Sequence, residues 1–385
     1  MKLRHSWLLA AWLVLPVFAA EQKPPDPTVV VTPTEDFRSF TVFSENDLYT
    51  LGTKSDRYYT TGQKFTWMSR RVCRFEQAFE SAWTKFFTEP ATKQAEQKAA
   101  AENQKAKRPF LSPTPPALQM RAAVSLGQSM FTPADLHTPL LQTNDRPYAA
   151  WLYLSAALQA RSVSDPCHAS GNRDWLTVWG ADVGAVGPAA LGKTIQDFVH
   201  DNISRSPRAQ GWAHQLRNEP GLNLFHQTKV RWTAGHRKQW AADAIAHAGF
   251  SIGNVATYLN GGGAVRFGYG LPDDFGIDII RSGADTSQAG GHASPWGAHL
   301  FAGFDVRAVG RDISLDGNTF ARSHHVAREV FVGDFQFGAA LTFWRWTLSL
   351  SQVRRTPEFK LQGNAQAYGS ITLSLPISDL RKLTR

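Results

Sequence analysis

The chain has 385 residues, with 41 Lys or Arg and 32 Asp or Glu, which gives a formal net charge of +9 at pH 7. This length fits one large domain or two smaller ones, and no apolar run reaches the roughly eighteen residues of a transmembrane helix. The basic balance favours anionic partners such as lipopolysaccharide phosphates. Nucleic acid is not expected as a partner, because no basic and aromatic binding motif accompanies the charge.

Residues 1–20 have the organisation of a secretory signal peptide. Lys2 and Arg4 precede the apolar run Trp7–Phe18, and two alanines follow where cleavage is expected. The run is too short to cross a bilayer as a helix, which argues against a membrane anchor. Loss of Lys2 and Arg4 on export lowers the formal charge from +9 to +7. Residues 21–36, rich in Pro and Thr, are then an extended lead-in.

The chain from residue 37 to residue 377 is dominated by alternating patterns. Phe37–Ser44 and Tyr59–Arg70 are the first two predicted strands, and in Phe331–Phe343 large apolar residues alternate with polar or small ones. Period-two alternation gives each strand one apolar and one polar face. We count about twelve such strands, an even number as in bacterial single-chain barrels.

A soluble β-sandwich would show the same alternation, so the residues at the strand ends decide between the two architectures. Aromatic girdles at the ends of strands are typical of a barrel whose outside faces lipid. Tryptophan and tyrosine residues cluster in this way here, namely Trp67, Trp151, Tyr153, Trp232, Trp240, Trp344 and Trp346. The sequence therefore predicts an all-β, transmembrane antiparallel β-barrel of the outer membrane, with a soluble periplasmic sandwich as the alternative.

Two segments and both cysteines fall outside these strands. Residues 84–117 have an Ala, Gln, Lys and Glu composition that buries little apolar surface, so a solvated periplasmic insertion is expected. Residues 378–385 follow the last strand as a short tail. Cys73 and Cys167 are both predicted on the periplasmic side, and export makes a disulfide between them a hypothesis.

Three polar clusters fall on the outer side of the barrel if the N-terminus is periplasmic. They are Ser44–Gly62, Asn144–Tyr148 and Gln196–His200, the last within Thr194–Ser204, which is predicted to form a short helix in an extracellular loop. Gln196 and His200 are four residues apart on that helix, so their side chains share one face. Strand-end loops are where a rigid sheet presents polar groups to a ligand.

These clusters contain groups that can carry chemistry. An imidazole such as His200 can act as a general base near neutral pH, although it is also one of twelve histidines, most of them expected to be solvated. Asn46 and Asp47, with a hydroxyl from Thr60 or Thr61, offer hard oxygen ligands that suit calcium rather than zinc or copper. The same residue types also form Asx turns in loops.

Charged pairs in the outer loops have two interpretations. We expect Arg57, Asp145 and Arg146 to contact substrate. The alternative is that the neighbouring residues Asp56–Arg57 and Asp145–Arg146 are ion pairs that only hold the loops.

One motif resembles a catalytic signature without its context. Gly249–Gly253 matches the G-x-S-x-G pattern of serine hydrolases, which requires a strand that turns sharply into a helix. No helical pattern follows Gly253, and three glycines lie at 261–263, so we do not expect a catalytic serine. His324 and His325 likewise lack metal-ligand spacing.

Several blocks of the sequence resemble the outer-membrane lipid A 3'-O-deacylases of the LpxR type. The blocks occur in the order of that family and cover most of the chain from Phe37 to about Phe225, whereas the C-terminal third is similar only as barrel strands. They are E-N-D at 45–47, D-R-Y-Y-T-T-G at 56–62, G-Q-S-M-F-T-P at 127–133, D-R-P-Y-A-A-W-L at 145–152, G-A-V-G-P at 184–188, Q-D-F-V-H at 196–200 and G-W-A-H-Q-L-R-N-E at 211–219.

The resemblance implies a twelve-stranded barrel that binds calcium and removes the 3'-linked acyloxyacyl group from lipid A, the lipid part of lipopolysaccharide, in the outer leaflet. It assigns the active site to Asn46, Asp47, Thr60 and His200, with Gln196 beside the base. In the family's scheme calcium stabilises the oxyanion and the histidine activates water, so Asn46 and Asp47 are the expected calcium ligands.

Two features depart from the family pattern. The family has a glutamate a few residues after the histidine, where this chain reads D-N-I-S-R-S-P at 201–207. Either Asp201 or Glu219 takes over the role of that glutamate, or the role is absent. The chain also lacks a terminal aromatic residue. The alternative function is therefore a non-catalytic outer-membrane barrel, namely a pore, an adhesin or a structural protein.

Overall fold

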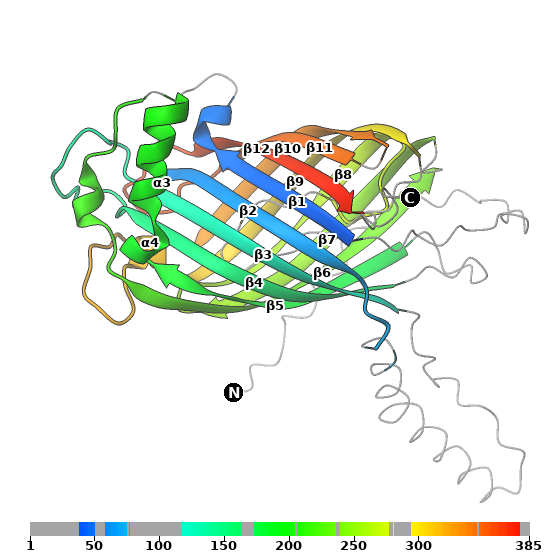
Figure 1. Ribbon diagram of the computed structural model, residues 1–385, viewed down its shortest axis with the longest axis horizontal. Coiled ribbons are helices and arrows are strands. Elements are labelled where there is room, and N and C mark those ends of the chain that lie inside the picture. Colours follow the sequence, from blue (N-terminus) through cyan, green and yellow to red (C-terminus); the bar gives the residue numbers. More distant parts are fainter. Residues whose placement is uncertain are drawn as a thin grey trace, which may run out of the picture. The chain divides into compact units, whose positions relative to one another are not determined.

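A computed structural model shows a closed antiparallel β-barrel (Figure 1). It describes residues 38–50, 58–74, 77, 118–162, 173–204, 206–235, 239–276, 280, 294–344 and 346–377. The proposed signal peptide, the lead-in, the insertion at 84–117, the tail, Arg57 and Cys167 lie outside these residues. The barrel closes because β1 pairs with β2 on one side and with β12 on the other. The predicted fold class is confirmed, and the closed barrel rules out the sandwich.

Each strand pairs with its neighbours in sequence, and the barrel has the predicted number of strands. The strands are β1 Arg38–Asn46, β2 Tyr58–Arg71, β3 Leu118–Thr132, β4 Ala149–Ser162, β5 Arg173–Val186, β6 Glu219–Gly235, β7 Trp240–Gly253, β8 Ala256–Tyr269, β9 Trp296–Asp312, β10 Phe331–Phe343, β11 Trp346–Arg355 and β12 Gln366–Ile377.

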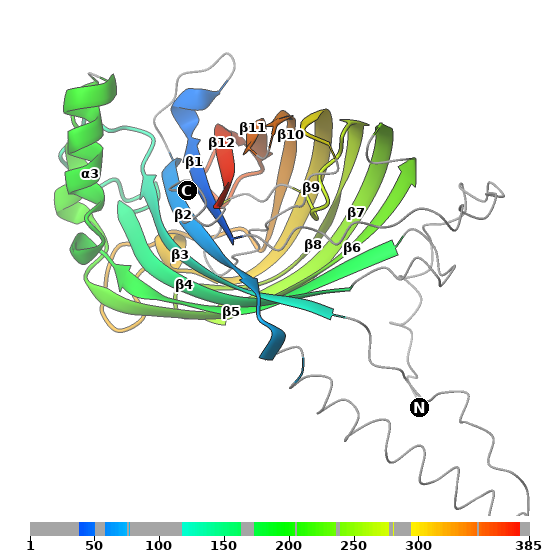
Figure 2. The ribbon, with the colours of Figure 1, turned by 45° about the vertical axis from the view of Figure 1, so that its right-hand side comes forward.

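Most of the described helical elements lie at one end of the barrel, which we call the α3 end (Figure 2). The predicted helix at Thr194–Ser204 is present as α3 (Gly192–Val199), continued by the π-helical turn η4 (His200–Ser204). The other elements at this end are η1 Asp47–Tyr49, η3 Pro188–Ala190, η5 Gly211–His214 and α4 Ile313–Asp316. No helix in the described part of the chain is long and apolar enough to cross a membrane.

Alternation divides each strand between an outward apolar face and an inward face that carries most of the buried polar groups. In β10, Phe335, Leu341 and Phe343 are exposed on the outside, whereas Asp334 and Thr342 are buried inside. An apolar exterior around a polar interior is the arrangement of membrane-spanning barrels.

The predicted aromatic girdle is only partly correct. Five of its seven members are exposed on the barrel, namely Trp67, Trp232, Trp240, Trp344 and Trp346. Trp151 and Tyr153 are instead buried inside it, because their parity in β4 is opposite to that of the exposed Leu154. They pack against loop residues such as Leu216 and Ile313, so the α3 end of the barrel interior is filled.

The segment after β8 folds back into the interior from the opposite end of the barrel. Phe275 is buried in a cluster with inward residues of β2 to β6, and the guanidinium of Arg231 lies 4.7 Å from its ring centre. Ile280 donates its backbone N–H to the buried carboxylate of Glu45 near the end of β1 (2.8 Å). This segment was not anticipated from the sequence.

Ion pairs hold this segment to the barrel wall. Asp273 pairs with Arg161 (2.7 Å) and Arg231 (2.8 Å), and Asp274 pairs with Arg266. Because buried charges are costly unless they are paired, the inward arginines of β4, β6 and β8 and these two carboxylates require one another. Among the described residues, packed side chains therefore occupy part of the interior at both ends of the barrel.

We predict that Asp273→Asn combined with Asp274→Asn releases this segment, because it leaves the arginines without two of their counter-charges. Chymotrypsin should then cut after Phe275 at least about tenfold faster, since proteolysis follows the population of the open form. The rate is measured on the purified barrel in detergent, with the cut located by mass spectrometry. The control is Asp135→Asn in the loop after β3. An unchanged rate in the double variant would show that apolar packing alone retains the segment.

Candidate functional site

The cross-strand register places the predicted site residues of β1 and β2 on the outward face of the wall. Asn46 pairs with Thr61, and Thr61 pairs in turn with Met130 of β3. Met130 pairs with Ala150 of β4. Directly paired residues in neighbouring strands lie on the same face of a sheet. Asn46 and Ala150 are therefore three strand spacings apart, about 14 Å, along one outward row near the α3 end.

Helix α3 covers the β3–β4 part of this row. Gln128, Met130 and Ala150 have outward parity but are buried, whereas Leu126 and Leu154, further along the same strands, are exposed. The carbonyl oxygen of Ala190, just before α3, accepts a hydrogen bond from Gln128 (2.5 Å). A Cβ at Gly192 would lie 2.5 Å from the side chain of Ala150, so only glycine permits this approach.

Gln196 lies on the buried side of α3, and the indole of Trp212 holds its side chain in place. Its Oε1 accepts a hydrogen bond from Nε1 of Trp212 (2.7 Å), and both side chains are buried. Because an indole N–H only donates, the other end of the carboxamide must be the NH2 group. That Nε2 atom is buried without a hydrogen-bond partner among the described residues. Gln196 therefore presents a donor, and Trp212 sets its orientation.

His200 follows on the same buried side of the helix. Its Nδ1 lies 2.7 Å from the backbone carbonyl oxygen of Pro207, and the side chain is buried. A carbonyl only accepts, so Nδ1 carries the proton and Nε2 carries the lone pair. This is the tautomer that a general base requires, and the predicted pairing of Gln196 with His200 on one face is confirmed.

Asn46 and Asp47 form the turn at the end of β1. The carboxamide oxygen of Asn46 caps η1 by accepting from the backbone N–H of Leu48 (2.7 Å), so the Asx-turn interpretation is correct for this side chain. Asp47 is fully buried, and its backbone carbonyl oxygen accepts from the Thr50 hydroxyl (2.8 Å).

The chemistry of these donors can be compared with calcium, the metal that the family resemblance implies. Asn46, Asp47 and Thr50 supply amide, carboxylate, carbonyl and hydroxyl oxygens only, which are the hard ligands that calcium prefers. Within the described ranges no three His, Cys, Asp or Glu side chains gather around a common point. The donors thus fit calcium in kind, and its other ligands would be water or substrate oxygens.

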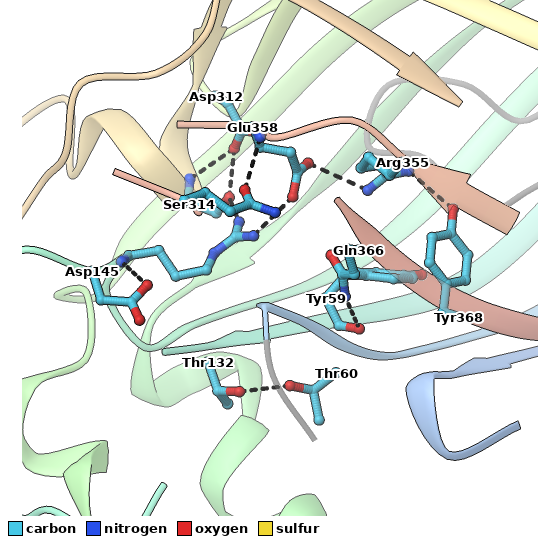
Figure 3. Close-up of polar contacts among 12 residues, drawn as sticks. Tyr59, Thr60, Thr132, Asp145, Asp312, Ser314, Arg355, Glu358, Gln366 and Tyr368 are labelled. Atoms are coloured by element: carbon cyan, nitrogen blue, oxygen red, sulfur yellow. Dashed lines mark hydrogen bonds and ion pairs between the residues drawn. The ribbon is translucent and has the colours of Figure 1, made fainter. Parts of the chain in front are cut away.

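Thr60 occupies an irregular position in β2, between the end of β1 that carries Asn46 and the part of β3 and β4 that α3 covers. The register of β2 against β3 shifts between Tyr59 and Thr61, and a bulge of this kind redirects a side chain. The hydroxyl of Thr60 lies 2.7 Å from that of Thr132 (Figure 3). Tyr58, two residues earlier, has a left-handed backbone (φ 68), which is a strained conformation for a tyrosine.

Sequence reasoning missed a polar row on the outward face beside Asn46. Gln63 donates to the hydroxyl of Ser44 (2.9 Å), which lies 3.2 Å from the hydroxyl of Tyr49. Ser44 and Tyr49 lie within the dense polar cluster at 44–62 and Gln63 directly follows it, but only the parity of β1 and β2 separates the outward Gln63 from the inward Lys64. Trp212 and Gln128 also belong to blocks shared with the family, and nothing in their spacing indicated a role.

Asp145 and Arg146 do not pair with each other through their side chains. Asp145 accepts from the backbone N–H groups of Ala134 (2.9 Å) and Arg146 (2.7 Å), and so shapes its own loop. The guanidinium of Arg146 is fully buried, bonded to Glu358 (2.9 Å) and to Ser314 (2.7 Å). Contact of either residue with substrate stays a prediction, whereas their loop-holding contacts are present.

Glu358 connects Arg146 to the barrel wall (Figure 3). It also bonds Arg355 of β11 (3.3 Å), which pairs in turn with Asp334 (2.6 Å). Burial of Glu358 opposes ionisation, but the charges of Arg355 and Arg146 outweigh it and hold the pKa of this carboxyl below its usual value. Its contribution to stability is present at neutral pH and is lost as the pH falls through that lowered pKa.

Neither candidate replacement for the family's glutamate is bonded to His200 in a described contact. Asp201 is exposed, and hydrogen bonds from Arg208 hold its pKa below the usual range. Glu219 is buried and accepts from Asn254 (2.9 Å) and from the backbone N–H of Thr319 (2.8 Å), which fixes the loops after β7 and β9.

Two further residues that the sequence singled out, Ser251 and His324, make hydrogen bonds to backbone carbonyl oxygens. Ser251 lies within β7, fully buried, and its hydroxyl donates to the carbonyl oxygen of Ala256 (3.1 Å), so the G-x-S-x-G match is not a nucleophile elbow. His324 contacts the Asp145 carbonyl oxygen (2.7 Å). Cys73 is exposed and free, and Cys167 lies outside the described residues, so the structure gives no support to their disulfide.

A closed barrel with an apolar exterior, on which a helix covers polar residues of the outward face, defines the class of outer-membrane barrel proteins. The chain belongs to the family described as outer membrane protein LpxR, whose model matches residues 7–377. Comparison with curated proteins gives no match.

A solved LpxR structure agrees with the family assignment at the level of the fold. LpxR from Salmonella typhimurium superposes with a TM-score of 0.63 and 18% identity, covering 88% of this chain and 99% of that one. The β domain of the Bordetella autotransporter BrkA has a TM-score of 0.43 and 10% identity, with 89% and 99% covered. The translocator domain of NalP from Neisseria meningitidis has a TM-score of 0.38 and 9% identity, with 88% and 87% covered.

We predict that Arg146→Met destabilises the loops of the α3 end by about 3–5 kcal/mol, because it leaves the buried Glu358 short of one partner. The measurement is the temperature at which the folded band is lost in heat-modifiability gels. The matched control, Lys360→Met, breaks the exposed pair with Glu329 (2.6 Å) and should cost no more than about 1 kcal/mol. Equal shifts in the two variants would contradict a structural role for Arg146.

Proposed function

We propose that this protein is an outer-membrane esterase that removes the 3'-linked acyloxyacyl group from lipid A. The observation that carries the proposal is His200, buried on a helix that covers the outward face of the barrel, with its Nδ1 bonded to a carbonyl. Membership of the LpxR family supports the same activity. A site on the outward face suits a substrate that never leaves the membrane.

In the proposed reaction, Nε2 of His200 takes a proton from water as the water oxygen bonds to the ester carbonyl carbon. The bond from that carbon to the sugar oxygen then breaks, and the sugar oxygen takes the proton back from His200. The products are a free fatty acid and a sugar hydroxyl. Gln196 donates its Nε2 hydrogens to the carbonyl oxygen as negative charge develops there.

Asn46 and Asp47 are the proposed calcium ligands. Bound calcium would supply a positive charge that polarises the ester carbonyl and stabilises the oxyanion. Thr60 of β2 lies between these ligands and the helix, and the polar row of Ser44, Gln63 and Tyr49 lies beside Asn46, so both can bind the polar part of the lipid. The alternative, a pore, is not favoured because packed side chains of the described residues occupy part of the interior at both ends of the barrel.

We predict that His200→Ala abolishes deacylation, with a loss of at least about 10²-fold because the general base is removed. Lipid A from cells that express each variant is analysed by mass spectrometry for loss of the 3' acyl groups. The matched control is His214→Ala in the same outer loop, where the ring contacts the carbonyl oxygen of Pro139 (3.1 Å). If wild type and His200→Ala leave the same acylation pattern in calcium-replete cells, the enzymatic proposal fails.

We predict a separate requirement for calcium. Chelation should stop deacylation by the purified protein, and added Ca²⁺ should restore it. Asp47→Asn should raise the Ca²⁺ concentration for half-maximal activity by at least about tenfold, because the affinity of such sites depends on ligand charge. Asp135→Asn serves as the control. Full activity in chelator would remove calcium from the proposal and leave the role of His200 standing.

A further inference from the structure

Helix α3 and the turn η4 have three chemically distinct sides. At 3.6 residues per turn, positions three or four apart share a side. The sides are, in turn, the buried Gly192, Gln196 and His200, the charged Lys193, Asp197 and Asp201, and the apolar Ile195 and Phe198, with the apolar Leu191 directly before the helix in a left-handed backbone conformation. On the charged side, Lys193 forms an ion pair with Asp197, and Asp201 forms one with Arg208. A helix that is buried on one side would normally expose only polar groups elsewhere, and this one does not.

The apolar side is strongly exposed. Leu191 is 49%, Phe198 60% and Ile203 69% exposed. Ile203 lies in the π-helical turn η4, whose wider turn rotates each residue less than an α-helix does and so keeps Ile203 nearer to the side of Phe198. The π turn thus extends the apolar edge beyond the end of α3, where a regular α-helix would rotate residue 203 away.

This edge continues the apolar outward face of the barrel. Ile195 packs against the same buried cluster as Leu152, an outward residue of β4. Two residues further along β4, Leu154 is 59% exposed on the outward surface. Because a barrel of this family meets lipid with that surface, the apolar edge of α3 is continuous with an established lipid interface.

The orientation of the helix agrees with an interfacial position. In Figure 1 α3 runs across the direction of the strands at the end of the barrel. Since strands of such barrels cross the membrane, a helix that runs across them is nearer to the membrane plane than to its normal. An in-plane helix with one apolar and one charged side is the pattern of interfacial helices.

We propose that α3 and η4 form an interfacial helix whose edge of Leu191, Phe198 and Ile203 docks into the acyl-chain layer of the outer leaflet. The charged side with Lys193 and Asp201 then faces the headgroups. This docking surface is independent of whether the protein hydrolyses an ester, since it needs only the membrane position of the barrel.

The proposal also gives Gln196 and His200 a defined depth. Their side of the helix lies between the apolar edge and the charged side, at the boundary of acyl chains and headgroups. The ester bonds of a lipid lie at that boundary. The helix would therefore hold the buried residues at the level of the ester groups, and a lipid would approach them laterally from the membrane.

The test measures the depth of single spin labels in the full-length barrel in lipid bilayers. Cys73 and Cys167 are replaced by serine, and labels are placed by Phe198→Cys, Ile203→Cys and Lys193→Cys in separate proteins. Leu154→Cys marks the lipid-facing wall. The accessibility of each label to oxygen and to a water-soluble nickel complex gives its depth. All four sites are exposed, and heat-modifiability gels confirm that each labelled barrel is folded.

Labels at Phe198 and Ile203 are expected to be protected from nickel and open to oxygen, as at Leu154, whereas the label at Lys193 is expected to be open to nickel. Equal nickel access at Phe198 and Lys193 would overturn the proposal. Spin–spin broadening at Phe198 that grows with protein density would also overturn it, because it would indicate a second copy on this face. The labels report position and not turnover, so failure of the esterase proposal would leave this result unaffected.

Discussion

The strict alternation of inward and outward side chains in a closed barrel is the constraint on which the rest of this structure depends. The side chain of each strand residue points either into the interior or toward the membrane, and because the barrel is closed no strand has an unpaired edge. Glu45 and Asn46 are neighbours in sequence, yet one is buried inside the barrel and the other lies on its outward face. The family's E-N-D block is therefore divided between two environments.

The interior follows from this constraint. Inward charges such as Arg231, Arg266 and Arg355 are each paired with carboxylates, some of them brought from a distant part of the chain. Pairing across the interior, together with the packing of the segment around Phe275 on β2 to β6, occupies part of the space inside the barrel.

On the outside, the constraint leaves covered polar residues where an apolar surface would be expected. Gln128 and Met130 have outward parity, and α3 shields them, so the wall near the α3 end can carry polar groups. The helix has to approach the wall closely, which Gly192 permits, and it brings Gln196 and His200 with it. A lipid substrate, if the proposed function is correct, meets the site without passing through the barrel.

The sequence was sufficient for the features that depend on local pattern. Alternation gave the strand number and the closed antiparallel barrel, and helical spacing gave α3 with Gln196 and His200 on one face. It failed for Trp151 and Tyr153, because an aromatic residue near a strand end belongs to the girdle only if its parity is outward. An error of one residue in the predicted register of a strand moves every side chain of that strand from the inward face to the outward face or the reverse.

Other features were decided by tertiary structure alone. Arg146 is separated by 212 residues from Glu358, and nothing local to either residue indicates the pair. The tautomer of His200 depends on the carbonyl oxygen of Pro207, and the orientation of Gln196 on the indole of Trp212. By itself the sequence determined the barrel and the residue types near its rim, because periodicity is a local property. The packing of segments that are distant in the chain decided which face of the barrel these residues occupy. It also decided which partners hold their side chains in place.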